Sequence, residues 1–340
     1  MIGVGIIGFG MATKVFHRPL IESVDGLKIL GVLRRDAAEK LDVPVFTELA
    51  EFLALPGLRL VVITTPNESH FPLAKACLEA GKAVVVDKPF TVTSQDGAEL
   101  VRLANGKKLP LAVFHNRRYD GDFLIVQQLH RDKTLGRLVS LESTFDRFRP
   151  ELRAGAWREG QQPGAGILYD LGPHLIDQAL LLFGKPHAVF AQVRAERDGD
   201  AADDAFDMSL LYGGVKVLLR ASMLAPVPRP RFLLQGTKGS YVKYDLDEQE
   251  RLLKSGVRPL DPNWNKAQNQ PGKLVLQRAH EVVTSELPTP LGDYRRFYVN
   301  MRDVLLGDAK LDIPAEAGVE SVRIIEAAFA SSRTQQVVTL

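Results

Sequence analysis

The sequence has almost no cysteine, and its positive and negative charges nearly cancel. Cys77 is the single cysteine among 340 residues, which excludes a disulfide within the chain and a cluster of thiolate metal ligands. The seven histidines include no HExxH pair and no two at ligand spacing beside a carboxylate, so we expect no protein-held metal. The 43 basic and 41 acidic residues leave a formal net charge of +2, too small to favour nucleic acid or a membrane surface as a partner.

Long apolar runs are also missing. No segment reaches the roughly 18 apolar residues that a membrane-spanning helix needs. The apolar start, Met1 to Met11, is interrupted by glycines and lacks the basic residue that precedes the apolar core of a secretory signal. Because a single cysteine also suits a reducing compartment, we expect a cytoplasmic protein. At roughly 150 residues per domain, the length suggests two domains.

The first part of the chain alternates short apolar runs with amphipathic stretches, as in a parallel sheet covered by helices. The apolar runs are continuous, which is expected where both faces of a sheet are buried. We predict strands at Ile2 to Ile7, Leu27 to Leu33, Leu60 to Thr64, Ala83 to Val86 and Leu109 to Phe114, with helices near Thr13 to Ser23, Thr47 to Leu55, Ser69 to Ala80 and Ser94 to Ala104. The pattern predicts an α/β Rossmann domain with a doubly wound parallel sheet over residues 1–120.

The pattern changes after a helix predicted near Asp122 to Arg131. Five strand-like segments follow, and Tyr212-Gly213-Gly214 is typical of a hairpin turn between two of them. These segments are Leu138 to Phe145, Ala188 to Val193, Phe206 to Tyr212, Val215 to Ala221 and Phe232 to Gln235. Arg251 to Gly272 is predicted to be a long surface excursion, and helices near Gly292 to Leu306 and Pro314 to Ser331 close the chain. Residues 121–340 are therefore predicted to be an α+β domain with a largely antiparallel open sheet.

A glycine-rich turn follows the first predicted strand and opens the first predicted helix. It reads Gly8-Phe9-Gly10-Met11-Ala12-Thr13. Gly8 would supply the tight turn, and Gly10 would let a pyrophosphate approach the helix N-terminus, where N–H groups and the helix dipole favour negative charge. Thr13 replaces the third glycine of the usual pattern, at a position that serves packing more than phosphate contact. The alternative is a tight turn without a ligand, but the βαβ context favours dinucleotide binding.

The second predicted strand ends in two arginines, Arg34 and Arg35, where an NAD-specific site usually carries an acidic residue for the ribose 2′-hydroxyl. A guanidinium can bind a 2′-phosphate in a bidentate way, so the strand end favours NADP over NAD, which stays possible. The alternative is a pair of solvated arginines with Asp36 capping the next helix.

Asp87-Lys88-Pro89 follows another predicted strand, at the edge where open α/β sheets bind ligands. Pro89 keeps the preceding residue out of helical geometry, so Lys88 would stand on an extended turn and could donate to a substrate hydroxyl. Thr65, Asn67 and His70 leave a neighbouring strand at the same edge and are candidate nicotinamide or ribose contacts. The alternative for Lys88 is an ordinary surface turn.

Asp170 and His174 lie close together around a predicted helix start. Pro173 is acceptable in a first helical turn, so the helix is expected to begin near it and to run to Phe183. Both side chains could then address one ligand, with Asp177 steadying the imidazole. A histidine can accept a hydroxyl proton near neutral pH, and such assistance is worth about 10² to 10⁴ in rate. The alternative is a capping or core histidine.

The glycine turn, Asp87-Lys88-Pro89 and the Asp170-x-x-x-His174 pair, in this order, resemble the Gfo/Idh/MocA oxidoreductase family. The usual triplet of that family is Glu-Lys-Pro, so Asp87 is a conservative departure. The resemblance implies hydride transfer at a sugar or polyol with Lys88, Asp170 and His174 as catalytic residues. It also implies a homodimer or a higher homo-oligomer formed through the sheet of the second domain. The stretches 16–21, 116–123 and 169–174 resemble a branch that contains NADP-dependent scyllo-inositol dehydrogenases.

Together these features predict an NADP-dependent dehydrogenase that acts on a secondary alcohol of a polyol or sugar. His174 would accept the hydroxyl proton, Lys88 would polarise the reacting oxygen, and Asp170 would position a neighbouring hydroxyl. Further candidates for substrate contact are Arg118, Tyr119 and Trp157. The alternatives are sugar, sugar-phosphate or dihydrodiol oxidation or redox-assisted glycoside cleavage on the same scaffold, and an NADP-sensing regulator without chemistry. A pure sensor would not need Lys88, Asp170 and His174 together.

Overall fold

A computed structural model describes residues 1–36, 40–153, 155–199 and 202–340. The chain forms two compact units. The first contains Met1–Asn116, Gln249–Ala267 and Asp293–Val319, and the second contains Arg117–Glu248, Gln268–Gly292 and Glu320–Leu340. Among the described residues, no helix has the length and apolar character to cross a membrane.

The first unit is built on a six-stranded sheet of order β3-β2-β1-β4-β5-β6, and every adjacent pair of strands is parallel. The strands are β1 Ile2–Ile7, β2 Leu27–Leu33, β3 Val45–Phe46, β4 Leu58–Ile63, β5 Ala83–Val86 and β6 Leu111–Val113. The strand order reverses between β1 and β4, which confirms the predicted doubly wound sheet. β1, β4 and β5 are almost wholly buried because helices cover both faces. The two-residue strand β3 has no sequence signal and was not predicted.

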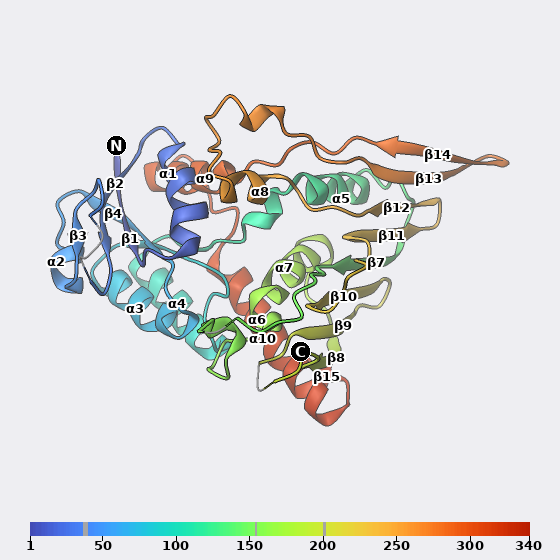
Figure 1. The fold of residues 1–340 in the computed structure, drawn as a ribbon, viewed down its shortest axis with the longest axis horizontal. Helices are drawn as coiled ribbons and strands as arrows, with labels where there is room; N and C mark the ends of the chain where they lie inside the picture. Colours follow the sequence, from blue (N-terminus) through green and yellow to red (C-terminus); the bar gives the residue numbers. More distant parts are fainter. Residues whose placement is uncertain (37–39, 154, 200–201) are drawn as a thin grey trace. The chain divides into compact units, whose positions relative to one another are not determined.

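Helices lie on both faces of this sheet, with α1 and α9 on one side and α3 and α4 on the other (Figure 1). The helical segments of residues 1–119 are η1 Thr13–His17, α1 Arg18–Glu22, α2 Leu49–Leu53, η2 Asn67–Ser69, α3 His70–Glu79, α4 Ser94–Lys107 and η3 Asn116–Tyr119. η1 is wound as a π-helix and continues directly into α1. α4 is capped by Thr93, whose side-chain oxygen accepts a hydrogen bond from the amide of Asp96 at 3.1 Å.

Two later segments belong to the first unit, which a division at residue 120 does not anticipate. They carry α8 Gln249–Lys254, η5 Trp264–Lys266 and α9 Arg295–Leu306. Arg59 donates to the carbonyl of Leu305 at 2.6 Å, and Arg302 donates to that of Asp25 at 3.0 Å. Trp264 is 3% exposed, so the stretch predicted to be a surface excursion packs into the unit. Its composition is polar and rich in proline, but a few of its apolar side chains are buried.

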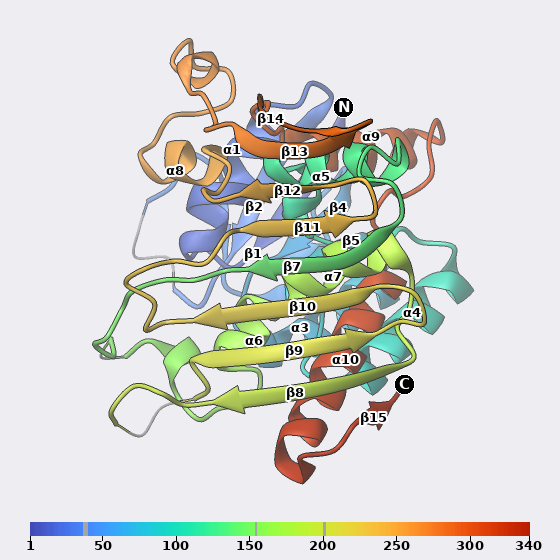
Figure 2. The same cartoon turned by 90° about the vertical axis from the view of Figure 1, so that its right-hand side faces the viewer.

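The second unit contains a nine-stranded sheet of order β14-β13-β12-β11-β7-β10-β9-β8-β15 (Figure 2). β7 and β10 pair in parallel and the other described neighbours pair antiparallel, so the sheet is largely antiparallel, as predicted. Its strands are β7 Leu138–Thr144, β8 Ala188–Arg194, β9 Ala205–Leu211, β10 Lys216–Ser222, β11 Phe232–Gly236, β12 Gly239–Lys243, β13 Gly272–Arg278, β14 Glu281–Leu287 and β15 Val338–Thr339. The sequence did not reveal β12 to β15, because their residues are mixed in polarity and, in β14, mostly exposed.

Helices cover one face of this sheet, and their apolar side chains meet the strands in one continuous core. They are α5 Gly121–Arg131, α6 Ile167–Asp170, α7 Gly172–Phe183 and the later part of α10 Ala315–Thr334, with the short η4 Trp157–Glu159 in the preceding loop. α6 and α7 are separated by Leu171 alone. The core thus fixes the short segment that carries Asp170 and His174.

Candidate functional site

The carboxyl ends of the parallel strands of the first unit are tied into one row by backbone hydrogen bonds. The amide of Gly8 donates to Leu33 O, and the amide of Thr64 donates to Ile7 O, each at 2.9 Å. The amide of Asp87 donates to Ile63 O at the same distance. The residue that follows each strand therefore lies at one edge of the sheet, beside the reversal of strand order. This is where open α/β sheets bind their ligands.

Thr13 closes the glycine turn from the helix side. Its Oγ1 donates to Gly8 O at 2.9 Å and lies 2.6 Å from Oγ1 of Thr64, a residue that follows β4. The side chain is fully buried. Thr13 thus does more than replace a glycine, because its hydroxyl binds the turn to the neighbouring strand end.

The turn has the geometry that a bound pyrophosphate requires. Gly8 has φ +97°, and a Cβ there would lie 2.9 Å from Thr64 Oγ1, so only glycine fits without strain. A Cβ at Gly10 would meet no atom within 4 Å, so its backbone faces open space at the start of the helix. The residues present therefore fit a dinucleotide phosphate, with backbone amides available at a helix N-terminus. Phe9 lies at the turn, with Lys14 Nζ 5.0 Å from its ring centroid; Met11 is half exposed.

Arg34 lies at the end of β2, as predicted, and its guanidinium carbon is 5.9 Å from the Phe9 ring centroid. It also forms an ion pair with Asp36, with an Nη2–Oδ1 distance of 3.3 Å and an Asp36 side chain that is 63% exposed. Arg35 is exposed. An ion pair with a solvent-exposed partner contributes little to stability, so a phosphate could compete with Asp36 for the Arg34 guanidinium. The alternative in which Asp36 caps a helix concerns residues 37–39, which lie outside the described residues.

Lys88 follows β5 at the same edge, in a bend that continues into Pro89 through a cis peptide bond. Its amide donates to Oδ1 of Asp87 at 2.8 Å. Burial alone would raise the pKa of Asp87, but His17, Lys88 and His70 outweigh it and lower that pKa to about 2. Asp87 is therefore a carboxylate throughout the physiological range and fixes the backbone from which the Lys88 side chain extends.

His70 ties the turn after β4 to the turn after β5. One ring nitrogen lies 2.9 Å from Pro89 O, and the other lies 2.9 Å from Thr65 O. Burial lowers the pKa of His70, although Asp87 and the backbone carbonyls oppose that effect. The ring is thus held by the two turns, and its influence on a cofactor would act through Thr65 and Pro89. Asn67, another predicted contact, is 5% exposed in η2 of the same turn.

Asp170 and His174 lie at the junction of α6 and α7 in the second unit. Asp170 is the last residue of α6, and His174 is in the first turn of α7, whose start at Gly172 agrees with the predicted helix. Two arginines missed by the sequence analysis flank Asp170: Arg147 approaches Oδ2 and Arg158 approaches Oδ1, each to 3.6 Å. They come from an extended segment after β7 and from η4, and nothing in the local sequence pairs them with Asp170. They provide positive charge beside a carboxylate that could orient a substrate hydroxyl.

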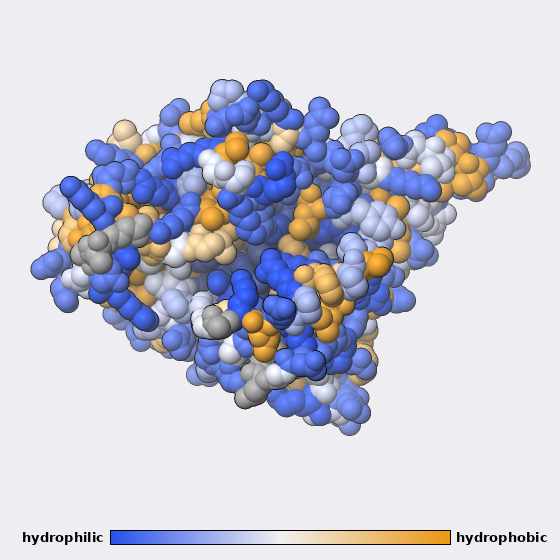
Figure 3. All heavy atoms as spheres, viewed as in Figure 1, coloured by the Kyte–Doolittle hydropathy of each residue, from blue (hydrophilic) through white to orange (hydrophobic). Residues whose placement is uncertain are grey.

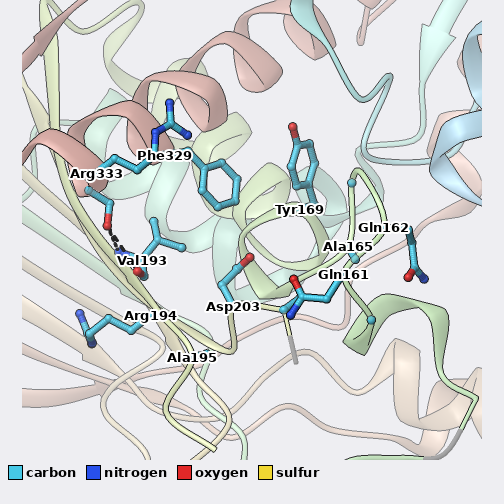
Figure 4. Close-up of a pocket in the computed structure, with 14 residues that line it drawn as sticks. Gln161, Gln162, Ala165, Tyr169, Val193, Arg194, Ala195, Asp203, Phe329 and Arg333 are labelled. Atoms are coloured by element: carbon cyan, nitrogen blue, oxygen red, sulfur yellow. Dashed lines mark hydrogen bonds between the residues drawn. The ribbon is translucent and has the colours of Figure 1, made fainter. Parts of the chain in front are cut away.

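The start of α6 is anchored by Asp203. Its Oδ2 accepts a hydrogen bond from the amide of Leu168 at 2.8 Å. Its carboxylate lines a pocket of about 360 Å³, where it points toward the rings of Tyr169 and Phe329 (Figure 4). These two rings stack with centroids 5.8 Å apart. Burial raises the pKa of Asp203 to about 6, although the backbone amides favour its ionised form. The carboxyl group that holds α6, and through it Asp170, thus titrates near neutral pH.

Asp203 should make the stability of the protein fall as pH rises. Its folded-state pKa of about 6 lies above the roughly 3.9 of an unfolded aspartate, so ionisation disfavours the folded state. Between pH 5 and 8 we expect the wild type to lose about 1 kcal/mol of unfolding free energy relative to Asp203→Asn, which keeps an acceptor for Leu168. Urea denaturation at several pH values measures this loss. The exposed Asp308→Asn variant is the control, and parallel wild-type and Asp203→Asn curves would contradict the assignment.

The other predicted substrate contacts also lie in the second unit. Arg118 donates two hydrogen bonds to Asp177, from Nε to Oδ2 at 2.8 Å and from Nη2 to Oδ1 at 2.6 Å. Asp177, which is predicted to steady His174, is thus also the bidentate partner of Arg118. Tyr119 is buried, and Trp157 is half-buried with the Arg158 guanidinium over its ring. Among the described residues, no cluster of three or more histidine, cysteine or carboxylate side chains could hold a metal ion.

A Rossmann unit with an open glycine turn, followed by an α+β unit with a large mixed sheet, defines a class of two-unit dinucleotide-binding proteins. Residues 2–115 match the family GFO_IDH_MocA, described as "Oxidoreductase family, NAD-binding Rossmann fold". Residues 128–340 match its companion, "Oxidoreductase family, C-terminal alpha/beta domain". The chain belongs to the Gfo/Idh/MocA family and is an oxidoreductase.

Individual relatives match along the full chain. The uncharacterized oxidoreductase YdgJ of Escherichia coli K12 is 43% identical over 98% of this chain and 96% of its own length. The scyllo-inositol 2-dehydrogenase (NADP(+)) IolW of Bacillus subtilis 168 is 38% identical over 100% of this chain and 96% of its own length. Among solved structures, yvaA of Bacillus subtilis superposes with a TM-score of 0.95 at 37% identity, covering 100% of this chain and 98% of that one.

Proposed function

We propose that this protein is an NADP-dependent dehydrogenase that oxidises a secondary alcohol of a polyol or sugar, or reduces the corresponding ketone. The observation that carries the proposal is the edge of the first sheet. There the open backbone of Gly10, the strand-end guanidinium of Arg34 and the turn of Lys88 follow strands of one parallel sheet. The similarity to IolW over the full chain supports an inositol-like substrate.

Each candidate residue has a role in this proposal. A bound nicotinamide supplies the hydride acceptor, so the alcohol loses a hydride from carbon and a proton from oxygen. His174, 6% exposed, takes the hydroxyl proton on its imidazole. The Lys88 ammonium donates to the reacting oxygen and favours its alkoxide character. Asp170, held between Arg147 and Arg158, accepts a hydrogen bond from a neighbouring hydroxyl. Arg118, Tyr119 and Trp157 remain candidate substrate contacts.

The proposal is tested by measuring NADPH formation with a panel of polyols that includes scyllo-inositol, beside direct NADP binding. Turnover of a polyol with NADP supports it. Binding of NADP with no turnover of any polyol, sugar or sugar phosphate would instead favour an NADP-sensing regulator. Turnover of a sugar phosphate or a dihydrodiol alone would keep the oxidoreductase and change its substrate.

We expect Arg34→Ala to raise the KM for NADP about tenfold or more while changing the KM for NAD little. A hydrogen bond to a charged group contributes about 1.5–3 kcal/mol, and only NADP carries the 2′-phosphate that Arg34 would bind. Arg102→Ala, which removes an exposed arginine from α4, is the control. Steady-state kinetics with both cofactors decides the matter: an unchanged ratio of the two KM values rules out this role for Arg34.

We further propose that the face of the nine-stranded sheet that carries no helix contacts a second copy of the chain. One row of cross-strand partners on this face runs Phe190, Ser209, Leu218, Glu142 and Leu233. Its apolar members are all partly exposed, with Phe190 at 37%. The tip of the β13–β14 hairpin, at the upper right of Figure 3, also shows hydrophobic residues among hydrophilic ones, and Val282 there is 67% exposed. Surfaces of this kind are typical of interfaces.

A further inference from the structure

A chain of buried polar groups lies behind Lys88 in the first unit. It consists of Tyr298 from α9, His17 from η1 and Asp87 from the end of β5. The Tyr298 hydroxyl and His17 Nδ1 are 2.5 Å apart, and His17 Nε2 faces Asp87 Oδ1 across 3.9 Å. The same Oδ1 accepts the amide of Lys88 at 2.8 Å. We call this arrangement the Tyr298–His17–Asp87 chain.

Aromatic packing holds the imidazole of His17 in place. Its ring lies 4.2 Å from that of Phe114, centroid to centroid, and Phe114 packs edge-on against Phe297 at 4.9 Å. The side chains of His17 and Tyr298 are fully buried, while that of Asp87 is 13% exposed. His17 Nε2 is buried and makes no hydrogen bond, which is a costly state unless the nearby carboxylate compensates it. The ring is therefore held for its interaction with Asp87.

The electrostatics assign one orientation to each hydrogen. Because Asp87 is a carboxylate, it favours the His17 tautomer with the hydrogen on Nε2. Nδ1 is then an acceptor and takes the hydrogen of the Tyr298 hydroxyl. Burial, with the charge of Asp87, raises the pKa of Tyr298 well above its usual value, so this hydroxyl keeps its hydrogen. The other titratable groups facing Asp87 are Lys88 and His70, and both favour its ionised form.

The Tyr298–His17–Asp87 chain ends at a fully buried hydroxyl, which restricts the functions that it can have. A proton route to solvent needs an exposed end, and Tyr298 has none. At the other end, Asp87 holds the Lys88 backbone at the edge of the sheet. We propose that Tyr298 and His17 are positioning residues that act through Asp87 to fix the turn carrying Lys88. This inference rests on the proposed function for the role of Lys88.

Tyr298→Phe is the gentlest test, because it removes one hydroxyl and keeps the ring that packs beside Phe114. We expect kcat with NADP and a polyol to fall about 10- to 100-fold, since small misplacements of a reacting group have effects of this size. The Kd for NADP should stay within about twofold, because the glycine turn and Arg34 are untouched. Tyr294→Phe is the matched control, since Tyr294 is another fully buried tyrosine just before α9. Equal kcat values for the two variants would overturn the proposal.

Two variants of His17 separate positioning from simple loss of packing. His17→Leu fills space but presents no polar N–H to Asp87, so kcat should fall as in Tyr298→Phe. His17→Gln carries an N–H donor near the position of Nε2 and should recover at least part of kcat. Thermal unfolding shows whether each variant is folded. A higher kcat in His17→Gln than in His17→Leu, at similar Tm, supports the positioning role of His17. Equal kcat values in these two variants would overturn it.

A readout without turnover keeps this inference distinct from the proposed function. The ¹⁵N NMR signals of His17 in the wild type without cofactor should show the tautomer with the hydrogen on Nε2, and Tyr298→Phe should weaken that preference. A hydrogen on Nδ1 in the wild type would overturn the chain as described. If His17 shows the Nε2 tautomer but no polyol is turned over, the result contradicts the proposed reaction and supports the hydrogen positions assigned to the Tyr298–His17–Asp87 chain.

Discussion

Replacing Lys88 by methionine is expected to lower kcat/KM with NADP and a polyol by about 10²- to 10⁴-fold, the range that acid-base and electrostatic assistance supplies. Methionine keeps most of the length and volume of the side chain and removes the charge and the hydrogen-bond donors. Asp87 accepts a hydrogen bond from the backbone amide of residue 88, which methionine also has, so the turn itself should persist. Stopped-flow measurement of NADP reduction gives the rate directly.

His174→Asn should produce a loss in the same range, because asparagine can hydrogen-bond but cannot accept a proton near neutral pH. In both variants the Kd for NADP, measured by fluorescence, should stay close to that of the wild type, because neither substitution alters the glycine turn. Lys75→Met, which removes a half-exposed lysine of α3 paired with Glu99, is the control. Wild-type rates in Lys88→Met or His174→Asn would exclude the proposed roles, whichever substrate is used.

The central strands of the first sheet were predictable because they are buried on both faces. Continuous runs such as Val84-Val85-Val86 have no competing interpretation once turns and amphipathic stretches separate them. The hairpin of β13 and β14 gave no such signal, since Val282 and most of its neighbours are exposed. Membership of α9 in the first unit was equally hidden, because contacts such as Arg302 with Asp25 O join residues far apart in sequence.

The residues of the candidate site also differ in whether the sequence could predict them. The glycine turn and Lys88 belong to short motifs that directly follow a strand, so they can be recognised in the sequence. Arg147 and Arg158 approach Asp170 only because the loop after β7 folds back onto α6, and Tyr298 reaches His17 over 281 positions of sequence. No spacing rule connects such residues. The bond between Asp177 and Arg118 was not foreseeable for the same reason, because the helix pattern says nothing of a partner 59 positions away in the sequence.

Arg118→Met is expected to lower the free energy of unfolding by about 3–5 kcal/mol, the range found when one partner of a buried ion pair is removed. The Arg118 side chain is 11% exposed and that of Asp177 is 1% exposed, so the variant leaves a buried carboxylate without its bidentate guanidinium. A surface pair gives the contrast: Arg131→Met removes an arginine that is 73% exposed beside Asp132, and it should change stability by less than about 1 kcal/mol.

The double variant Arg118→Met with Asp177→Leu should recover most of that loss, because no buried charge is left and similar volume is retained. Chemical denaturation of the full chain measures all four proteins, and the coupling between the two substitutions follows from the cycle. The same cycle separates a structural from a substrate-binding role for Arg118. A raised KM for the polyol with an unchanged denaturation midpoint would contradict the buried-pair account and assign Arg118 to the substrate. A large stability loss that the second substitution reverses shows that the pair mainly holds η3 to α7.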